Sequence, residues 1–85
     1  MKFIEVAKMV VETKTAHLIR PRKGADMEYD AKPIFTGSKR GWVMLDLFTA
    51  GAVTAVADAI SEPNREKMNR IPPRKVIEFA FAHVA

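Results

Sequence analysis

The stretch "TGSKRGWVMLDLFTAGAVTAV", residues 36–56, contains the point at which the sequence changes from a strand-like to a helix-like pattern. Gly37 and Gly41 bracket a basic turn, and the short apolar run "WVML" follows. Farther on, apolar residues recur at the helical spacing i, i+3, i+4, i+7: Val53, Val56, Ala57 and Ile60. The stretch therefore predicts a turn, a short strand and then a helix.

The same turn has the composition of a phosphate-binding loop, but its spacing argues against one. A phosphate loop of the Gly-x4-Gly-Lys-Ser/Thr type leads directly into a helix. Here no Gly-Lys-Ser/Thr follows Gly37, and strand-like sequence separates Gly41 from the helix. The two glycines instead predict a hairpin turn that uses positive φ angles.

On the N-terminal side of this stretch, the residues are typical of strands. Residues 9–20, "MVVETKTAHLIR", are rich in β-branched side chains, which predicts a strand that ends at Pro21. Residues 2–8 fit either a short helix or a strand. Residues 27–35, "MEYDAKPIF", alternate apolar and polar side chains, and Pro33 places this second strand at a sheet edge or a bend.

Toward the C-terminus, three short helices are predicted. Thr49 is the expected N-cap of the first, with Phe48 and Val53 at hydrophobic-staple spacing. Ser61 is expected to cap a second helix over residues 62–70, with Met68 buried. Pro73 or Pro72 opens the third, whose expected apolar face consists of Ile77, Ala80, Phe81 and Val84.

These elements predict one α+β domain, a small antiparallel sheet in the N-terminal half followed by three short helices packed on it. Residues 1–46 are mostly strand and turn, and residues 47–85 are helical. The 85 residues leave little room for a deep substrate pocket. The chain has no cysteine, which excludes disulfides and thiolate-bound metals. No targeting segment or membrane span is recognised, so we expect a soluble protein of the cytoplasm.

Catalytic and metal-binding patterns are not found in the sequence. The two histidines, His17 and His83, have no nucleophile or metal-ligand spacing around them. Asp26, Glu28 and Asp30 alternate on a strand-like stretch but lack the glycine and the terminal glutamate of a calcium loop. We therefore expect no enzyme activity and no cofactor.

The formal net charge of +4 is concentrated in two basic blocks, residues 20–40 and 61–75. Such blocks are typical of proteins with an acidic partner, nucleic acid or protein, and equally of solvated surfaces. The nucleic-acid candidates are Arg65, Lys67, Arg70, Arg74 and Lys75. A helix-turn-helix reading is weakened by the prolines of "NRIPPR" and by the strongly apolar last helix.

Surplus apolar residues favour a protein interface. Phe79 lies about 200° around the last helix from Ile77 and Phe81, so a monomer core does not easily bury all three. We expect a homodimer that covers Phe79. Trp42, beside Lys39 and Arg40, is either a buried structural aromatic or a binding anchor. The predicted interface residues are thus Trp42, Arg40 and Phe79.

Residues 41–84 resemble small uncharacterised proteins of bacteriophages, especially those of actinobacteria. The likeness rests on "GWV", "LD", "FTA", "AVADAI", "NREKM" and "FAFAHV". It implies a phage accessory protein made in the bacterial cytoplasm, and it supplies no catalytic residue. The leading hypothesis is a non-enzymatic module that docks on another protein, and the resemblance implies that this partner is a host protein. The alternative is a small DNA-binding protein that uses the basic residues of positions 65–75.

Overall fold

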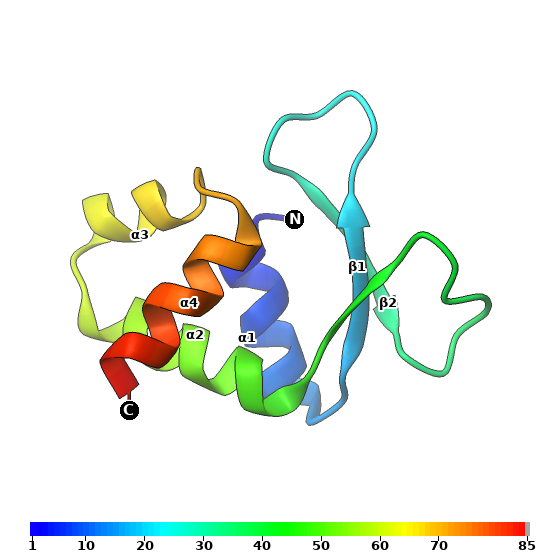
Figure 1. Ribbon diagram of the computed structural model, residues 1–85, viewed down its shortest axis with the longest axis horizontal. Coiled ribbons are helices and arrows are strands. Elements are labelled where there is room, and N and C mark those ends of the chain that lie inside the picture. Colours follow the sequence, from blue (N-terminus) through cyan, green and yellow to red (C-terminus); the bar gives the residue numbers. More distant parts are fainter. Residues whose placement is uncertain (85) are drawn as a thin grey trace.

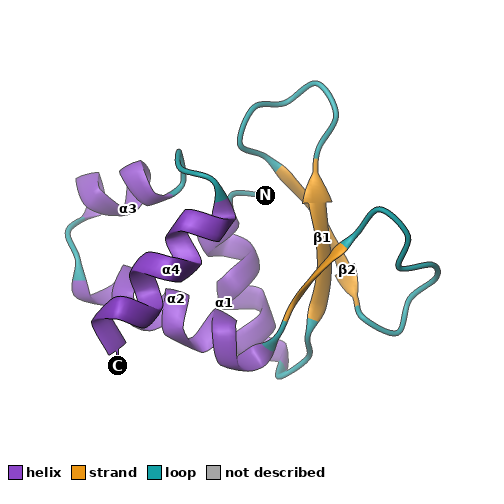
Figure 2. Ribbon diagram, in the orientation of Figure 1, coloured by secondary structure: helices purple, strands orange, loops and turns teal. Residues whose placement is uncertain are grey.

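The computed structural model describes residues 1–84, with the side chain of Val84 outside the described part (Figure 1). The elements in chain order are α1 (Phe3–Thr13), β1 (His17–Pro21), β2 (Tyr29–Pro33), β3 (Val43–Leu45), α2 (Leu47–Ala59), α3 (Glu62–Met68) and α4 (Pro73–Val84). Figure 2 shows the helices gathered on one side of the sheet. The predicted α+β class is confirmed.

The sheet has the strand order β2-β1-β3, with β1 antiparallel to both neighbours. Ile19 of β1 lies opposite Ala31 of β2 and Val43 of β3. Because successive side chains of a strand point to opposite faces, this row lies on one face of the sheet and Leu18 with Met44 on the other. We call the face toward the helices the inner face and its reverse the outer face.

Helix α1 corrects the prediction of a strand over residues 9–20. The helix runs through Thr13, and the first strand begins only at His17. Phe3, Val6 and Val10 share one buried helical face, which packs into the core. Burial of that face outweighs the mild strand preference of the β-branched residues in its last turn. The helix ends where Lys14 adopts a left-handed conformation and its N–H reaches the carbonyl groups of the last turn.

The N-cap of α2 is Asp46 rather than the predicted Thr49. The Asp46 Oδ1 atom accepts a hydrogen bond from the Thr49 N–H at 2.6 Å. An aspartate satisfies a free N–H of the first turn and places negative charge at the positive end of the helix dipole. Phe48 consequently lies inside the helix, 77% exposed and stacked on Phe81, instead of preceding it as half of a staple.

The later helices follow the prediction with small shifts. Ser61 occupies the N-cap position of α3 without a side-chain hydrogen bond, and α3 ends at Met68, which is buried as expected. Helix α4 begins at Pro73. Among its described side chains, Val76 and Ala80 are buried, whereas the predicted core residues Ile77 and Phe81 are only partly buried. The fourth residue of the predicted apolar face, Val84, lies outside the described side chains.

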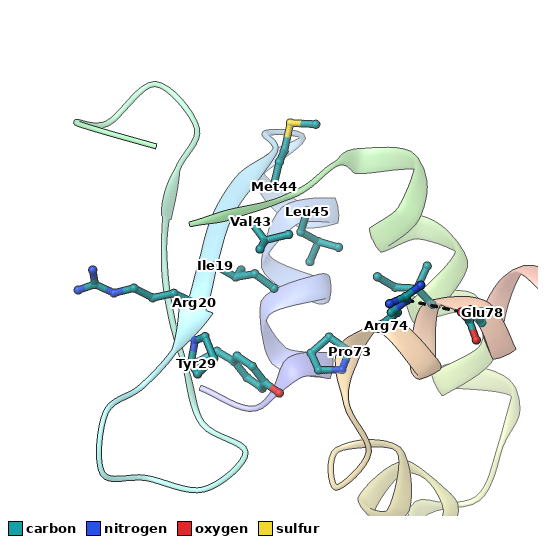
Figure 3. Close-up of a pocket in the computed structure, with 11 residues that line it drawn as sticks. Ile19, Arg20, Tyr29, Val43, Met44, Leu45, Pro73, Arg74 and Glu78 are labelled. Carbon is teal, nitrogen blue, oxygen red and sulfur yellow. Dashed lines mark ion pairs between the residues drawn. The ribbon is translucent and has the colours of Figure 1, made fainter. Parts of the chain in front are cut away.

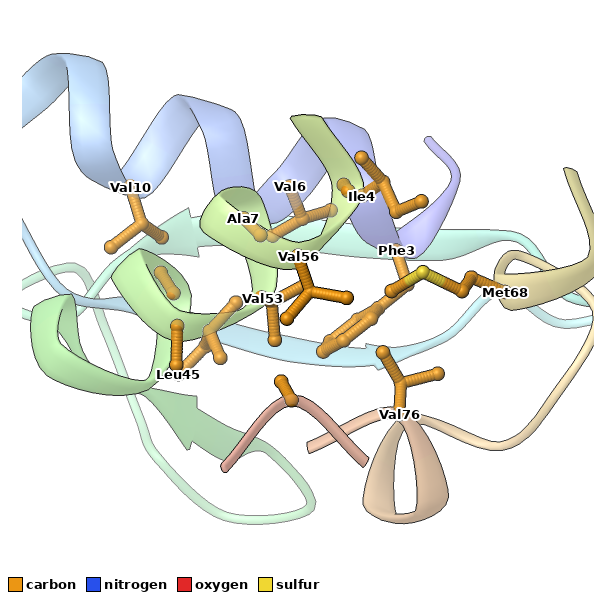
Figure 4. Packing of buried hydrophobic residues seen from close by; sticks show 14 of the residues in the cluster. Phe3, Ile4, Val6, Ala7, Val10, Leu45, Val53, Val56, Met68 and Val76 are labelled. Atoms are coloured by element: carbon orange, nitrogen blue, oxygen red, sulfur yellow. The ribbon is translucent and has the colours of Figure 1, made fainter. Parts of the chain in front are cut away.

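All four helices and the sheet contribute side chains to one core (Figure 4). Its most deeply buried members include Phe3 and Val10 of α1, Leu45 of β3, Val53 of α2 and Val76 of α4. Helix α1 packs against α2, and α2 packs against α4. This stacking leaves α4 facing the β3 side of the sheet. None of the described helices combines the length and the hydrophobicity that a membrane crossing requires.

Candidate functional site

A groove of about 520 Å³ lies between the inner face of the sheet and α4 (Figure 3). Its size falls within the range of ligand-binding clefts in proteins. The apolar side chains that line it belong to Ile19, Pro21, Tyr29, Val43, Leu45, Pro73 and Ile77, and Arg20 and Met44 border it with side chains that point away (Figure 3). The groove is thus a predominantly apolar surface assembled from three strands and one helix.

Strand alternation explains the wall that β3 forms. Val43 and Leu45 are two residues apart and therefore point to the same face, toward the groove (Figure 3). Leu45 is 2% exposed and belongs to the core, whereas Val43 is 66% exposed. On the opposite wall, Ile77 of α4 packs against the core while it remains partly open to solvent. The base of the groove therefore belongs to the core, and its walls remain available for contact.

The polar groups at the groove are few. Arg74 and Glu78 form an i, i+4 ion pair on α4 at 3.8 Å, and the Arg74 side chain is 91% exposed. Exposed pairs of this kind contribute only about 0.3–0.5 kcal/mol. Burial raises the pKa of the Tyr29 phenol, and the nearby Asp26 carboxylate raises that pKa further, so Tyr29 is neutral at physiological pH. These groups suit the binding of apolar side chains more than acid–base chemistry.

The apolar surface continues beyond the groove along α4. Phe81 follows Ile77 by one helical turn, and its ring stacks on that of Phe48 with centroids 5.6 Å apart. Leu47, 42% exposed, lies beside Phe48 at the start of α2. Partly buried apolar side chains therefore continue along α4 from Ile77 at the groove to Phe81, which contacts Phe48 in the first turn of α2.

Trp42 is neither a core residue nor a freely exposed anchor. It is half-buried, with the Arg20 guanidinium carbon 4.2 Å and the Lys32 ammonium nitrogen 4.5 Å from its ring centroid. These cations come from β1 and β2, whereas Lys39 and Arg40 are the basic residues that flank Trp42 in the sequence. Lys32 also donates to the Ser38 carbonyl oxygen at 2.9 Å. The cation–π cluster therefore holds the turn after β2 against the outer face of the sheet.

The three predicted interface residues do not share one surface. Arg40 is exposed in the turn before β3, near Trp42. Phe79 lies on α4, 41% exposed, with its ring 4.1 Å from that of His83. It borders a separate cavity of about 310 Å³ between α3 and α4. Trp42 and Arg40 are thus near each other because only Gly41 separates them in the chain, and Phe79 lies on a different part of the molecule.

The predicted nucleic-acid residues have divergent roles. The Arg65 Nη1 atom donates to the carbonyl oxygens of Ala57 at 3.0 Å and Ile60 at 2.8 Å, at the end of α2. Arg65 is therefore a helix C-cap contact. Arg74 lies at the groove and pairs with Glu78. The other three candidates, Lys67, Arg70 and Lys75, are exposed to solvent.

The histidines and the acidic trio have local structural contacts. His17 is 4% exposed, and its Nδ1 atom lies 2.8 Å from the Thr15 carbonyl oxygen. A hydrogen bond from Arg22 to Asp30 at 2.9 Å lowers the pKa of the Asp30 carboxyl. Glu28 pairs with the Lys2 ammonium group at 3.4 Å. Within residues 1–84, no cluster of three or more histidine, aspartate or glutamate side chains is placed to hold a metal ion.

The groove itself was not predicted from the sequence. The available signal was weak: "WVML" contains neither a charge nor a proline, the usual marks of a protected sheet edge. Its other wall comes from α4, some thirty residues later in the chain. No protein-family model, curated protein or solved structure matched the chain in the comparisons.

Proposed function

We propose that this chain is a non-enzymatic module that docks on another protein, and that the groove between β3 and α4 is its docking surface. The observation that carries the proposal is a ligand-sized apolar groove with exposed walls beside a sheet edge. Covering apolar surface stabilises a complex by roughly 25 cal/mol for each Å² removed from water. Contiguous apolar surface of this kind marks interaction sites in soluble proteins. The phage resemblance favours a bacterial protein of the cytoplasm as the partner.

The alternative, DNA binding through residues 65–75, has less support. Arg65 holds the end of α2, and Arg74 pairs with Glu78 beside the groove. A DNA-binding surface needs several cations directed toward phosphates, because phosphate contacts supply most of the affinity. A protein with this modest charge is expected to bind duplex DNA only non-specifically, at roughly 10⁻⁴ M at physiological salt.

The test uses a matched pair of variants in affinity capture from a bacterial lysate. Val43→Glu places a charge on the exposed wall of the groove, where the folded state tolerates it because Val43 is 66% exposed. Ala82→Glu adds the same charge to the exposed, solvent-facing side of α4 and serves as the control. Thermal melts of both variants check that each is folded.

We expect wild type and Ala82→Glu to retain the same partner protein after nuclease treatment, and Val43→Glu to lose it. Equal capture by all three proteins would contradict docking through the groove. A nanomolar complex with duplex DNA at physiological salt, with an affinity that falls steeply as salt rises, would support the alternative instead.

A further inference from the structure

The two edges of the sheet differ in how well they are protected against pairing with another chain. Edge strand β2 carries Asp30, Lys32 and Pro33, residue types that discourage pairing. Its Tyr29 N–H also donates to the Met1 carbonyl oxygen at 2.8 Å, so the N-terminal segment covers part of this edge. The β2 edge is therefore blocked.

The β3 edge has no such charge, proline or covering segment among the described residues, and only its short length discourages pairing. It contains Val43, Met44 and Leu45, without a charge or a proline. In an antiparallel pair, alternate residues direct their N–H and C=O groups away from the partner strand. Because β1 lies on one side of β3 only, the groups on the other side are free to pair with an additional strand.

The two faces beside this edge have different chemistry. The inner face is the apolar groove, with Val43 at its rim. The outer face carries Lys32 and Arg20 around Trp42, with Arg20 paired to Asp30 at 3.6 Å, and the turn that leads into β3 adds the exposed Lys39 and Arg40. Within the described residues, neither Lys39 nor Arg40 has an ion-pair partner.

From this arrangement we infer that the partner presents an extended segment that alternates apolar and acidic residues and adds to β3 as a fourth strand. Strand alternation directs its apolar side chains into the groove and its carboxylates toward the basic outer face. The inference rests on the proposed function, since it specifies what the groove accepts.

A second copy of the chain fits this edge less well. Two β3 strands related by a two-fold axis would run antiparallel, and the strand that each copy presents, Val43–Leu45, has no carboxylate to meet the basic face of the other copy. The nearest carboxylate in the sequence, that of Asp46, already accepts the Thr49 N–H at the start of α2. The charge pattern therefore favours an acidic partner over self-pairing.

The experiment begins with selection from a random peptide display library on the folded protein, followed by rescreening on Val43→Glu and Ala82→Glu. A selected peptide is then synthesised with and without N-methyl groups on alternate backbone nitrogens, which removes its edge hydrogen bonds but keeps its side chains. We expect selected peptides to alternate apolar and acidic residues. Both Val43→Glu and N-methylation should weaken binding by roughly tenfold or more, whereas Ala82→Glu should not.

A charge reversal tests the outer face independently. In the double variant Lys39→Glu, Arg40→Glu, both residues are exposed, so the fold is expected to persist. We expect it to reject the acidic peptide and to bind better a version in which lysine replaces each acidic residue. The amide NMR signals of β3 should shift when wild type binds the acidic peptide.

The outcomes separate the two proposals. In one outcome, the selected peptides fail to bind Val43→Glu, but they either have no preference for acidic residues or still bind after N-methylation. The strand-addition inference is then wrong, and the groove proposal stands. If binders ignore Val43→Glu, or none is selected, the groove proposal fails as well. A single-stranded oligonucleotide that binds more tightly than any peptide, and is released by the Lys39, Arg40 reversal, would assign the basic face to nucleic acid and overturn the inference.

Discussion

Replacement of Arg65 by alanine tests whether this residue supports the fold or serves a binding surface. Its guanidinium donates to the carbonyl oxygens of Ala57 and Ile60 at 3.0 and 2.8 Å. The last carbonyl groups of an α-helix have no partner within the helix, and a cation near them also interacts favourably with the helix dipole. Removal of Arg65 therefore leaves the end of α2 without this support.

The expected loss follows from these two contacts. Hydrogen bonds to a charged group contribute about 1.5–3 kcal/mol each when buried. The Arg65 side chain is 32% exposed, so water replaces part of each bond, and we expect a total loss of about 2 kcal/mol from the free energy of unfolding. For a domain of this size, that loss lowers the melting temperature by roughly 8–16 °C.

The assay is thermal unfolding followed by circular dichroism, with the fluorescence of Trp42, the single tryptophan, as a second probe. Arg70→Ala is the matched control, because Arg70 is exposed and its side chain has no hydrogen bond or ion pair among the described residues. Its effect should stay below about 0.5 kcal/mol. Melting of Arg65→Ala within about 2 °C of Arg70→Ala would refute the reasoning, since it would show that the Arg65 contacts do not stabilise α2.

Three further predictions concern the core, the groove and self-association. Val56→Asp should unfold the domain or nearly so in a thermal melt, because an unpaired buried carboxylate costs several kcal/mol against a stability of about 5–15 kcal/mol. Tyr29 is the only tyrosine, and its absorbance titration should give a pKa above the ordinary 10.0. The stability that the neutral phenol provides should be present below pH 10 and lost as pH rises through the raised pKa of the folded state. The Tyr29→Phe variant should not lose stability in this pH range. Light scattering should detect a micromolar homodimer that Phe79→Glu dissociates without unfolding; a wild-type mass near 9.5 kDa at high concentration would exclude it.

Several features of the fold could be predicted from local spacing. The stripe of Val53, Val56 and Ala57 identified α2, and Pro73 marked the start of α4. Gly37 and Gly41 have the predicted positive φ angles, but the predicted hairpin is wrong, because the strands on either side, β2 and β3, both pair with β1 and not with each other. These signals are local, because helix periodicity, proline and glycine act through residues only a few positions away.

Other features depended on packing that the sequence pattern does not contain. The residues from Met9 to Thr13 suit either a strand or a helix, and α1 forms because its apolar face packs against α2. Thr49 and Asp46 are both acceptable N-caps, and the structure selects Asp46. Local preferences at these sites differ by little, so tertiary contacts decide between them.

The candidate site also combines features that the sequence predicts with features that only packing decides. The unprotected edge at Val43 is visible in the sequence as an apolar run, but nothing in that run indicates that Ile77 faces it across a groove. Basic residues that look alike in the sequence also differ in the structure: Arg65 bonds to α2, whereas Arg40 remains exposed. A residue's type and spacing set which face of an element it occupies, whereas its burial and its partners depend on distant elements that only the folded chain brings into contact.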